Sequence, residues 1–192
     1  MDKRRSDTRE RIRSVAIELF AERGYETTSL REIAERLDVT KAALYYHFRT
    51  KEDIVASLFE DLHRGIDDIV RWAESAPPGR ERSEHIVLRY GELLHDLGRD
   101  MIRFWAENQS ALGEIGIGAS LRGQFRTLAD LMAGPDRTPI AVFHARQALL
   151  AISLSLSMMN DLDLGNDESH TAATQLALDI AARVFPSYAE PE

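Results

Sequence analysis

The sequence predicts an all-α fold. Apolar residues recur at intervals of three and four along most of the chain, which is the period of an amphipathic helix. No stretch alternates apolar and polar residues with the β-branched enrichment of a strand. Pro77, Pro78 and Gly79 form the strongest break in the helical pattern. We therefore expect roughly nine helices, divided between a small N-terminal domain of three helices and a larger C-terminal helical domain.

The first four helices have clear sequence signals at their ends. An apolar stripe at helical period runs through residues 12–20, and Gly24 is placed to end this helix in a left-handed conformation. Ser29 and Glu32 have the spacing of a capping box, which begins the second helix. Thr40 is an N-cap for the third helix, and Thr50 is an N-cap for a long fourth helix over 51–76.

Five further helices are expected after the Pro-Pro-Gly break. Their predicted ranges are 86–97, 100–109, 121–132, 139–162 and 171–185. Gly113, Gly116 and Gly118 predict a loop between the second and third of these helices.

Composition limits the class of protein. A chain of 192 residues with 44% apolar and 29% charged residues is typical of one large or two small globular domains. The absence of cysteine excludes a disulfide framework, a cysteine zinc site and a thiolate nucleophile. No apolar run approaches the ~18 residues that span a bilayer, and no apolar segment follows the charged N-terminus. We expect a cytoplasmic protein with no membrane partner.

The charge is unevenly distributed. The net charge is −8, yet residues 1–51 carry more basic than acidic residues, whereas 52–192 carry about twice as many acidic as basic residues. A basic N-terminal region on an acidic protein favours a polyanion-binding region at that end. Chance variation in a short segment explains the asymmetry about equally well.

Residues 29–51 form the most informative pattern. Two short helices joined by a turn of three or four residues are a helix-turn-helix. Ala34 is small where the helices cross, Val39 is apolar after the turn, and Leu44 and Phe48 anchor the second helix. The side chains left facing outward are Thr40, Lys41, Ala42, Tyr45 and Tyr46. Such a row suits the major groove of DNA, although a plain corner between two helices stays an alternative.

Residues 6–55 resemble the DNA-binding domain of the TetR family of bacterial transcriptional regulators. The matching residues include Gly24-Tyr25, Ile33-Ala34, Val39 and above all the block from Leu44 to Asp53. The chain departs from the family at Asp38, where glycine is usual, but Asp tolerates the left-handed conformation better than most residues. The resemblance implies a DNA-binding domain over 1–51 and a ligand-binding and dimerisation domain over 52–192, connected by the helix at 51–76.

The resemblance also implies roles for single residues. Arg31 matches a position at the edge of the groove, and Lys51 matches a phosphate-binding lysine at a helix N-terminus. Tyr46 and His47 match contacts to the DNA backbone. The residues that match base-facing positions are Thr40, Lys41, Ala42 and Tyr45. Lys41 can pair with guanine and Ala42 can meet a thymine methyl group. Tyr45 as part of the core and His47 as a helix cap are alternatives.

A basic arm precedes this domain. Lys3, Arg4, Arg5 and Arg9 are compatible with an arm in the minor groove and equally with a solvated tail.

The resemblance implies a small-molecule pocket in the C-terminal domain. Large apolar residues and one polar residue are candidates to line it: Trp72, Tyr90, Leu94, Met101, Trp105, Phe125, Met132, Phe143 and Gln147. Most of these residues also fit an ordinary hydrophobic core. The histidines have no metal-ligand spacing, so we expect no metal site, and we expect no cofactor.

The last two helices are expected to form a dimer interface. Their candidate interface residues are Ala148, Ile152, Ser155, Met159, Ala173, Ala177, Ile180 and Val184. Small side chains allow close approach, and two such helices from each copy make a four-helix interface about a two-fold axis. Packing of both helices inside one chain is the alternative.

The sequence therefore predicts a homodimeric, ligand-responsive transcriptional regulator. We expect a repressor that binds a near-palindromic operator in double-stranded DNA and is released by an apolar or aromatic effector. An all-α carrier or enzyme with an incidental helix-turn-helix is an alternative, but no nucleophile–base pair or phosphate loop supports an enzyme. A non-specific architectural DNA binder is a further alternative, which the acidic C-terminal region disfavours.

Overall fold

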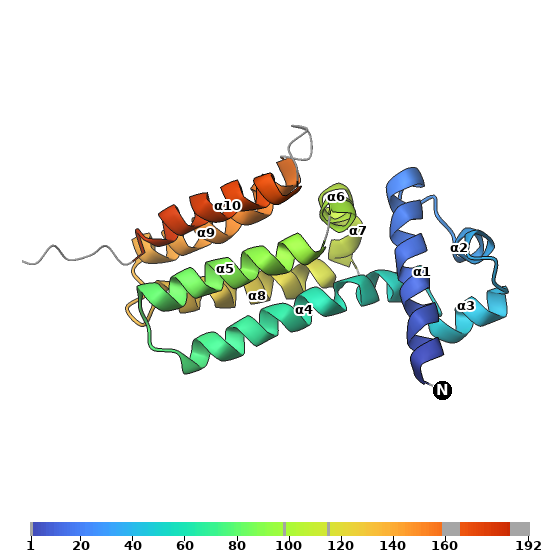
Figure 1. The fold of residues 1–192 in the computed structure, drawn as a ribbon, viewed down its shortest axis with the longest axis horizontal. Helices are drawn as coiled ribbons and strands as arrows, with labels where there is room; N and C mark the ends of the chain where they lie inside the picture. The colour runs from blue at the N-terminus through green and yellow to red at the C-terminus, as the bar shows by residue number, and fades with distance from the viewer. Residues whose placement is uncertain (1, 98, 115, 159–165, 185–192) are drawn as a thin grey trace, which may run out of the picture. The chain divides into compact units, whose positions relative to one another are not determined.

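The computed structural model describes residues 2–97, 99–114, 116–158 and 166–184. Within these ranges it contains ten α-helices and no strand, which confirms the all-α prediction (Figure 1). The chain divides into two compact units. The first comprises Met1–Leu62 and Asp100–Gly118, and the second comprises His63–Arg99 and Ala119–Glu192.

The first unit contains the helix-turn-helix. It is built from α1 (Asp2–Arg23), α2 (Leu30–Arg36), α3 (Lys41–His47), the first part of α4 (Lys51–Ser75), most of α6 (Arg99–Glu107) and α7 (Gln109–Glu114). Phe20 is fully buried, lies edge-on to Tyr25 with ring centroids 5.3 Å apart, and stacks on Phe104 at 5.4 Å. Because α6 supplies Phe104 to this aromatic core, the compact unit extends beyond the predicted range 1–51.

Helix α7 lies where the sequence predicts a loop, which raises the count from roughly nine to ten. The Leu112 backbone N–H donates to the Asn108 carbonyl at 3.0 Å, and the Leu112 side chain is buried. This apolar anchor keeps the segment helical despite Gly113. The chain leaves the helical conformation at Gly116, whose φ is +80°.

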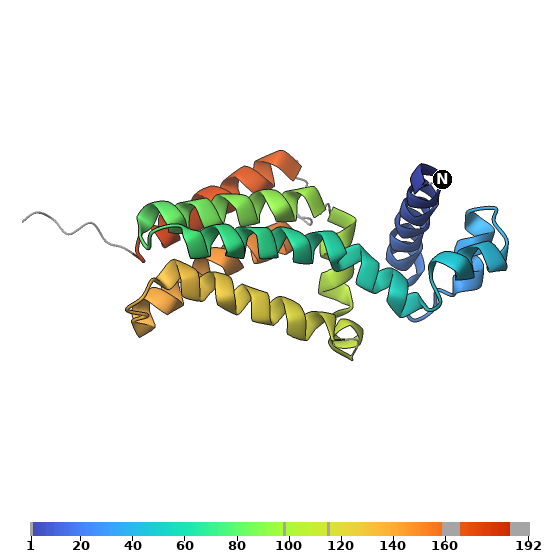
Figure 2. The same ribbon diagram turned by 90° about the horizontal axis from the view of Figure 1, so that it is seen from below.

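The second unit is a helical bundle. It contains the rest of α4, α5 (Arg80–Leu97), α8 (Ile117–Ala133) from residue 119, α9 (Pro139–Met158) and α10 (Asn166–Ala181). Helices α9 and α10 lie side by side, and α10 also packs against α5 (Figures 1 and 2). Their facing surfaces consist largely of small buried side chains: Ala145, Ala148, Ala173, Ala177 and Ala181.

Polar side chains join three helices of this bundle. The buried Arg82 guanidinium donates to the carbonyls of Ala73, Ala76 and Leu131 at 3.3, 3.2 and 2.6 Å. The Gln124 amide of α8 donates to the His63 carbonyl at 3.1 Å. These bonds fix α4, α5 and α8 within the unit.

No helix in the described ranges is long and apolar enough to cross a membrane.

Candidate nucleic-acid interface

A capping box sets the start of α2. The Ser29 hydroxyl accepts from the Glu32 backbone N–H at 3.3 Å, and the Glu32 carboxylate accepts from the Ser29 backbone N–H at 2.8 Å. The same carboxylate accepts from the Ser29 hydroxyl, and these hydrogen bonds lower the pKa of Glu32. Reciprocal capping satisfies donors that the helix itself leaves unpaired. The start of the helix-turn-helix is therefore fixed by local interactions.

The turn between α2 and α3 has a left-handed residue at Asp38, where φ is +54°. The Asp38 N–H donates to the Glu35 carbonyl at 3.2 Å, and the Val39 N–H donates to the Ala34 carbonyl at 3.0 Å. These two bonds make a Schellman motif, which usually has glycine at the left-handed position. The turn thus keeps its usual geometry with an aspartate in place of glycine.

Helix α3 presents the side chains that the sequence predicts for base contacts. The Thr40 hydroxyl caps the helix by accepting from the Ala43 N–H at 3.1 Å. Leu44 and Phe48 are buried beneath the helix. Lys41 and Ala42 are exposed, and so is Tyr45, with 49% of its surface accessible. The exposed fraction of Tyr45 removes the alternative that it belongs to the core.

The basic side chains in and around the helix-turn-helix differ in their ion pairs. Lys41 and Arg49 are exposed and make no ion pair with any residue of the described ranges. Arg31 pairs with Glu35 at 2.6 Å, so a DNA phosphate would compete with that carboxylate. Arg49 was not among the residues predicted from the sequence, although a basic residue two positions after the end of α3 is a usable signal.

Arg9 and the N-terminal residues belong to α1 rather than to a separate arm. The Arg9 guanidinium lies 4.7 Å from the Phe48 ring centroid and pairs with Glu60 at 3.3 Å. Helix α1 begins at Asp2, so the backbone of Lys3, Arg4 and Arg5 is helical, while their side chains lie outside the described set.

The other residues predicted to contact the DNA backbone lie in α3 or at the start of α4. Tyr46 is 66% exposed, and its ring lies edge-on to the half-buried His47 ring at 5.3 Å. Lys51 lies at the start of α4, where its ammonium donates to the Tyr25 carbonyl at 2.6 Å and lies 4.1 Å from the Tyr25 ring centroid. Lys51 thus has an intramolecular partner, which a phosphate would have to share or replace.

The predicted ligand-pocket residues lie in several different surroundings within the described ranges. Met132 is fully buried, and Tyr90 is buried with its hydroxyl 3.0 Å from the Ser153 hydroxyl. Leu94 is buried and Phe125 is half-buried, whereas Phe143 and Gln147 are exposed on α9. Met101 and Trp105 belong to the first unit, where Trp105 lies edge-on to Phe59.

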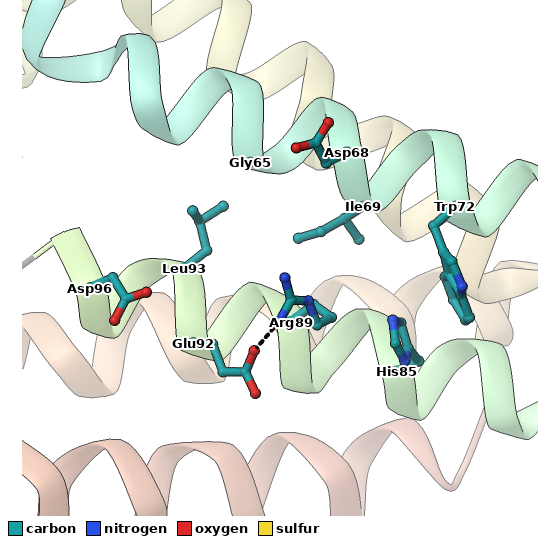
Figure 3. A pocket seen from close by; sticks show the side chains of 9 residues that line it. All are labelled: Gly65, Asp68, Ile69, Trp72, His85, Arg89, Glu92, Leu93 and Asp96. Atoms are coloured by element: carbon teal, nitrogen blue, oxygen red, sulfur yellow. Dashed lines mark hydrogen bonds and ion pairs between the residues drawn. The ribbon is translucent and has the colours of Figure 1, made fainter.

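One pocket of the second unit includes a predicted residue, Trp72. It lies between α4 and α5 and has a volume of about 270 Å³ (Figure 3). Its other side chains are mostly charged, among them Asp68, Arg89 and Asp96. The sequence gives no signal for these residues, because charged positions at helical spacing usually indicate a solvated face.

Four of the predicted dimer-interface residues are fully buried within one chain. Ala148, Ile152, Ala173 and Ala177 each have at most 1% of their surface accessible, because α5, α9 and α10 pack against one another within one chain. Val184 is also buried and Ile180 is half-buried. Met159 and the Ser155 side chain lie outside the described residues. The buried alanines therefore serve the fold of the monomer, and a second copy would have to contact other side chains.

Comparison with known proteins identifies the family. The profile of the bacterial regulatory proteins, tetR family, matches residues 12–58. The HTH-type transcriptional regulator TtgR of Pseudomonas putida is 31% identical over 187 residues, covering 84% of this chain and 87% of TtgR.

Two solved structures have the same fold. A TetR-family transcriptional regulator from Marinobacter aquaeolei VT8 has a TM-score of 0.69 and 20% identity, covering 95% of this chain and 94% of that one. The SmeT–triclosan complex has a TM-score of 0.64 and 21% identity, covering 97% and 98%. The matched profile spans the helix-turn-helix, and the similarity to TtgR extends over both compact units. The chain belongs to the TetR family of bacterial transcriptional regulators and is a DNA-binding transcriptional regulator.

Proposed function

We propose that this regulator is a repressor that binds a near-palindromic operator as a homodimer and is released by a small-molecule effector. The observation that carries the proposal is helix α3, which buries Leu44 and Phe48 and exposes Lys41, Ala42 and Tyr45. SmeT, which shares the fold, forms a complex with triclosan, and this supports an aromatic effector for the present chain.

Base reading is assigned to the N-terminal part of α3. Lys41 is exposed and makes no ion pair within the part of the chain that the structure describes, so its ammonium can donate to guanine O6 and N7 in the major groove. The methyl group of Ala42 can contact a thymine methyl group. Arg49 follows α3 and, with Tyr46 and His47, is assigned to contact DNA phosphates.

Homodimerisation is assigned to the exposed faces of α9 and α10. Four large apolar side chains of α9 and one of α10 are exposed: Ile140, Phe143, Leu150, Leu154 and Leu176. Those of α9 lie three, seven and four residues apart, which places them along one side of a helix. Two copies joined there would present two α3 helices to two half-sites, and occupation of an operator would obstruct transcription.

The test separates base reading from general attraction to DNA. The operator is first selected from a pool of random-sequence duplexes, and its affinity is then measured by fluorescence anisotropy beside that of an unselected duplex. Lys41→Ala should weaken operator binding by about 1–3 kcal/mol per half-site and binding to the unselected duplex much less. Arg122→Ala, which removes an exposed charge from α8, is the control and should change neither affinity.

Equal losses on both duplexes would show that Lys41 contacts the backbone and not a base. If the selection recovers no preferred sequence, the assignment as an operator-binding repressor is wrong.

A further inference from the structure

The side chains of Thr50 and Asp53 cap the start of α4 and bind the loop that connects it to α3 (Figure 1). The Thr50 hydroxyl accepts from the Asp53 backbone N–H at 3.0 Å. In the other direction, one oxygen of the Asp53 carboxylate, Oδ2, accepts from the backbone N–H groups of Arg49 and Thr50 at 3.1 and 3.0 Å. This is a capping box with one additional bond, which reaches back to Arg49. Asp53 therefore fixes the backbone of the residue that is assigned above to a DNA phosphate.

Phe48 anchors the other end of this loop. It is the C-cap of α3, its backbone is extended, and its side chain is buried. Its N–H donates to the Leu44 carbonyl at 3.0 Å. Arg49 and Thr50 thus lie between a buried anchor and the first turn of α4. The Arg49 side chain is exposed and makes no ion pair among the residues that the structure describes.

The charge of Asp53 opposes DNA binding, whereas its hydrogen bonds favour it. A carboxylate close in sequence to Arg49 and Lys51 repels DNA phosphates. Its hydrogen bonds satisfy two backbone donors before α4, and they reduce the conformational freedom that Arg49 loses when it contacts a phosphate. The charge and the hydrogen bonds therefore predict opposite effects on DNA affinity when the side chain is removed.

We infer that Asp53 is a positioning residue for DNA binding, which holds the Arg49 backbone so that the guanidinium reaches a phosphate beside the recognition helix. Asp53 acts through Arg49 and not through a contact of its own with DNA. The inference rests on the assignment of Arg49 as a phosphate contact in the proposed function.

The first test removes the carboxylate and measures affinity for an unselected duplex by fluorescence anisotropy at several salt concentrations. Asp53→Ala should weaken binding by roughly three- to tenfold for each bound copy. It should also flatten the log–log salt dependence by about 0.9 for each copy, as for the loss of one phosphate contact. If only the charge of Asp53 mattered, the same variant would bind DNA more tightly. Far-ultraviolet circular dichroism verifies that each variant is folded under the assay conditions.

Asp53→Asn separates the charge from the hydrogen bonds. Because Oδ2 alone accepts both N–H groups, an amide with one oxygen can replace the carboxylate. Asp53→Asn should restore the salt dependence that Asp53→Ala loses and should bind DNA at least as tightly as the wild type. Glu26→Ala is the matched control, because Glu26 is exposed and its side chain makes no hydrogen bond within the described ranges. This control should flatten nothing and should bind DNA no more weakly than the wild type.

A double-mutant cycle shows whether Asp53 acts through Arg49. Arg49→Ala should itself flatten the salt dependence, and the addition of Asp53→Ala should then cause no further change. Three results would overturn the inference. These are additive effects of the two substitutions, an Asp53→Ala protein that binds DNA as tightly as the wild type or more tightly, and an Asp53→Asn protein that behaves like Asp53→Ala.

The same cycle distinguishes failure of this inference from failure of the proposed phosphate contact. If Arg49→Ala leaves DNA binding unchanged, Arg49 is not a phosphate contact, and the role of Asp53 is wrong with it. If Arg49→Ala weakens binding while Asp53→Ala does not, the phosphate contact stands and only the role of Asp53 is wrong.

Discussion

At the residue scale, the Lys51 ammonium holds the loop that follows α1. It donates to the Tyr25 carbonyl at 2.6 Å and lies over the Tyr25 ring. The Tyr25 hydroxyl in turn donates to Glu52 at 3.0 Å. Burial, reinforced by the Glu52 carboxylate, raises the pKa of Tyr25 well above its usual range. The loop and the start of α4 are therefore joined by two polar contacts and one cation–π contact.

Lys51→Met should destabilise the first unit. Methionine keeps the aliphatic chain but removes the charge and the donor, so the free energy of unfolding should fall by about 1–2 kcal/mol in urea denaturation. Lys41→Met is the control, because Lys41 is exposed and pairs with no acidic residue among those the structure describes, and it should change stability by less than about 0.5 kcal/mol. Unchanged stability of Lys51→Met, together with a flatter salt dependence of DNA binding, would instead identify Lys51 as a phosphate contact.

His170 should make the free energy of unfolding of the second unit depend on pH. Its ring lies 4.6 Å from the His95 ring, and its buried Nδ1 atom has no hydrogen-bond partner among the residues that the structure describes. Burial, followed by the neighbouring His95, lowers the pKa of His170, while Glu92, Asp96 and Asp167 act in the opposite direction. The unfolded chain therefore takes up the proton first as the pH falls.

The ordinary pKa of histidine is about 6.5. Above that pH, His170 should contribute fully to the free energy of unfolding. This contribution should be lost as the pH falls from there toward the lower pKa of His170 in the folded state. His170→Gln should consequently show a smaller loss of stability than the wild type between pH values of about 7.5 and 5.5 in urea denaturation. The carboxylates are common to both proteins, so the difference isolates His170. Parallel pH profiles would contradict this account.

At the element scale, the turn between α2 and α3 is strained at a single residue. A non-glycine residue in the left-handed conformation costs of order 1 kcal/mol, although aspartate tolerates it better than most. Asp38→Gly should remove this strain and raise the free energy of unfolding by about 0.5–1 kcal/mol, after allowance for the flexibility of glycine in the unfolded chain. Asp38→Val, measured in the same thermal unfolding series, should lower stability because a β-branched residue resists φ > 0. If glycine destabilises the turn, interactions of the aspartate side chain outweigh the strain.

Helix ends were predictable where the signal is local. The capping box at Ser29, the N-cap at Thr40 and the left-handed residues at Gly24 and Asp38 all occur as the sequence indicates. Each depends on contacts within a few residues of the chain. Helix α7 was missed because it depends on the burial of Leu112, which is a tertiary interaction.

At the scale of the whole molecule, the proposed dimer interface consists of the exposed apolar side chains of α9 and α10, and a substitution there tests it. Phe143→Glu should give monomers by size-exclusion chromatography with light scattering at micromolar concentration, because a charge would be buried in the proposed interface. Its thermal stability as a monomer should change little, since Phe143 is 57% exposed. Operator affinity should fall because one copy supplies half of the contacts.

Ala177→Glu introduces the same charge as Phe143→Glu, but at a buried position on α10. Ala177 is fully buried between helices of one chain, so a carboxylate there should lower the free energy of unfolding by more than about 3 kcal/mol. A folded, dimeric Ala177→Glu protein would show that the alanines are not needed for packing within the monomer. A dimeric Phe143→Glu protein would move the interface away from this surface.

The sequence by itself determined the helix-turn-helix, its caps and the outward row of α3, because these follow from periodicity and from contacts between near neighbours. It did not distinguish core residues from pocket-lining residues. It also did not distinguish residues that pack within one chain from residues that contact a second copy. Periodicity states which side of a helix is apolar, but not what covers it. The tertiary structure decided that Ala148 is buried within one chain and that Phe143 is left exposed. It also placed Trp72 and His85 together from two helices, a juxtaposition that depends on how α4 and α5 pack.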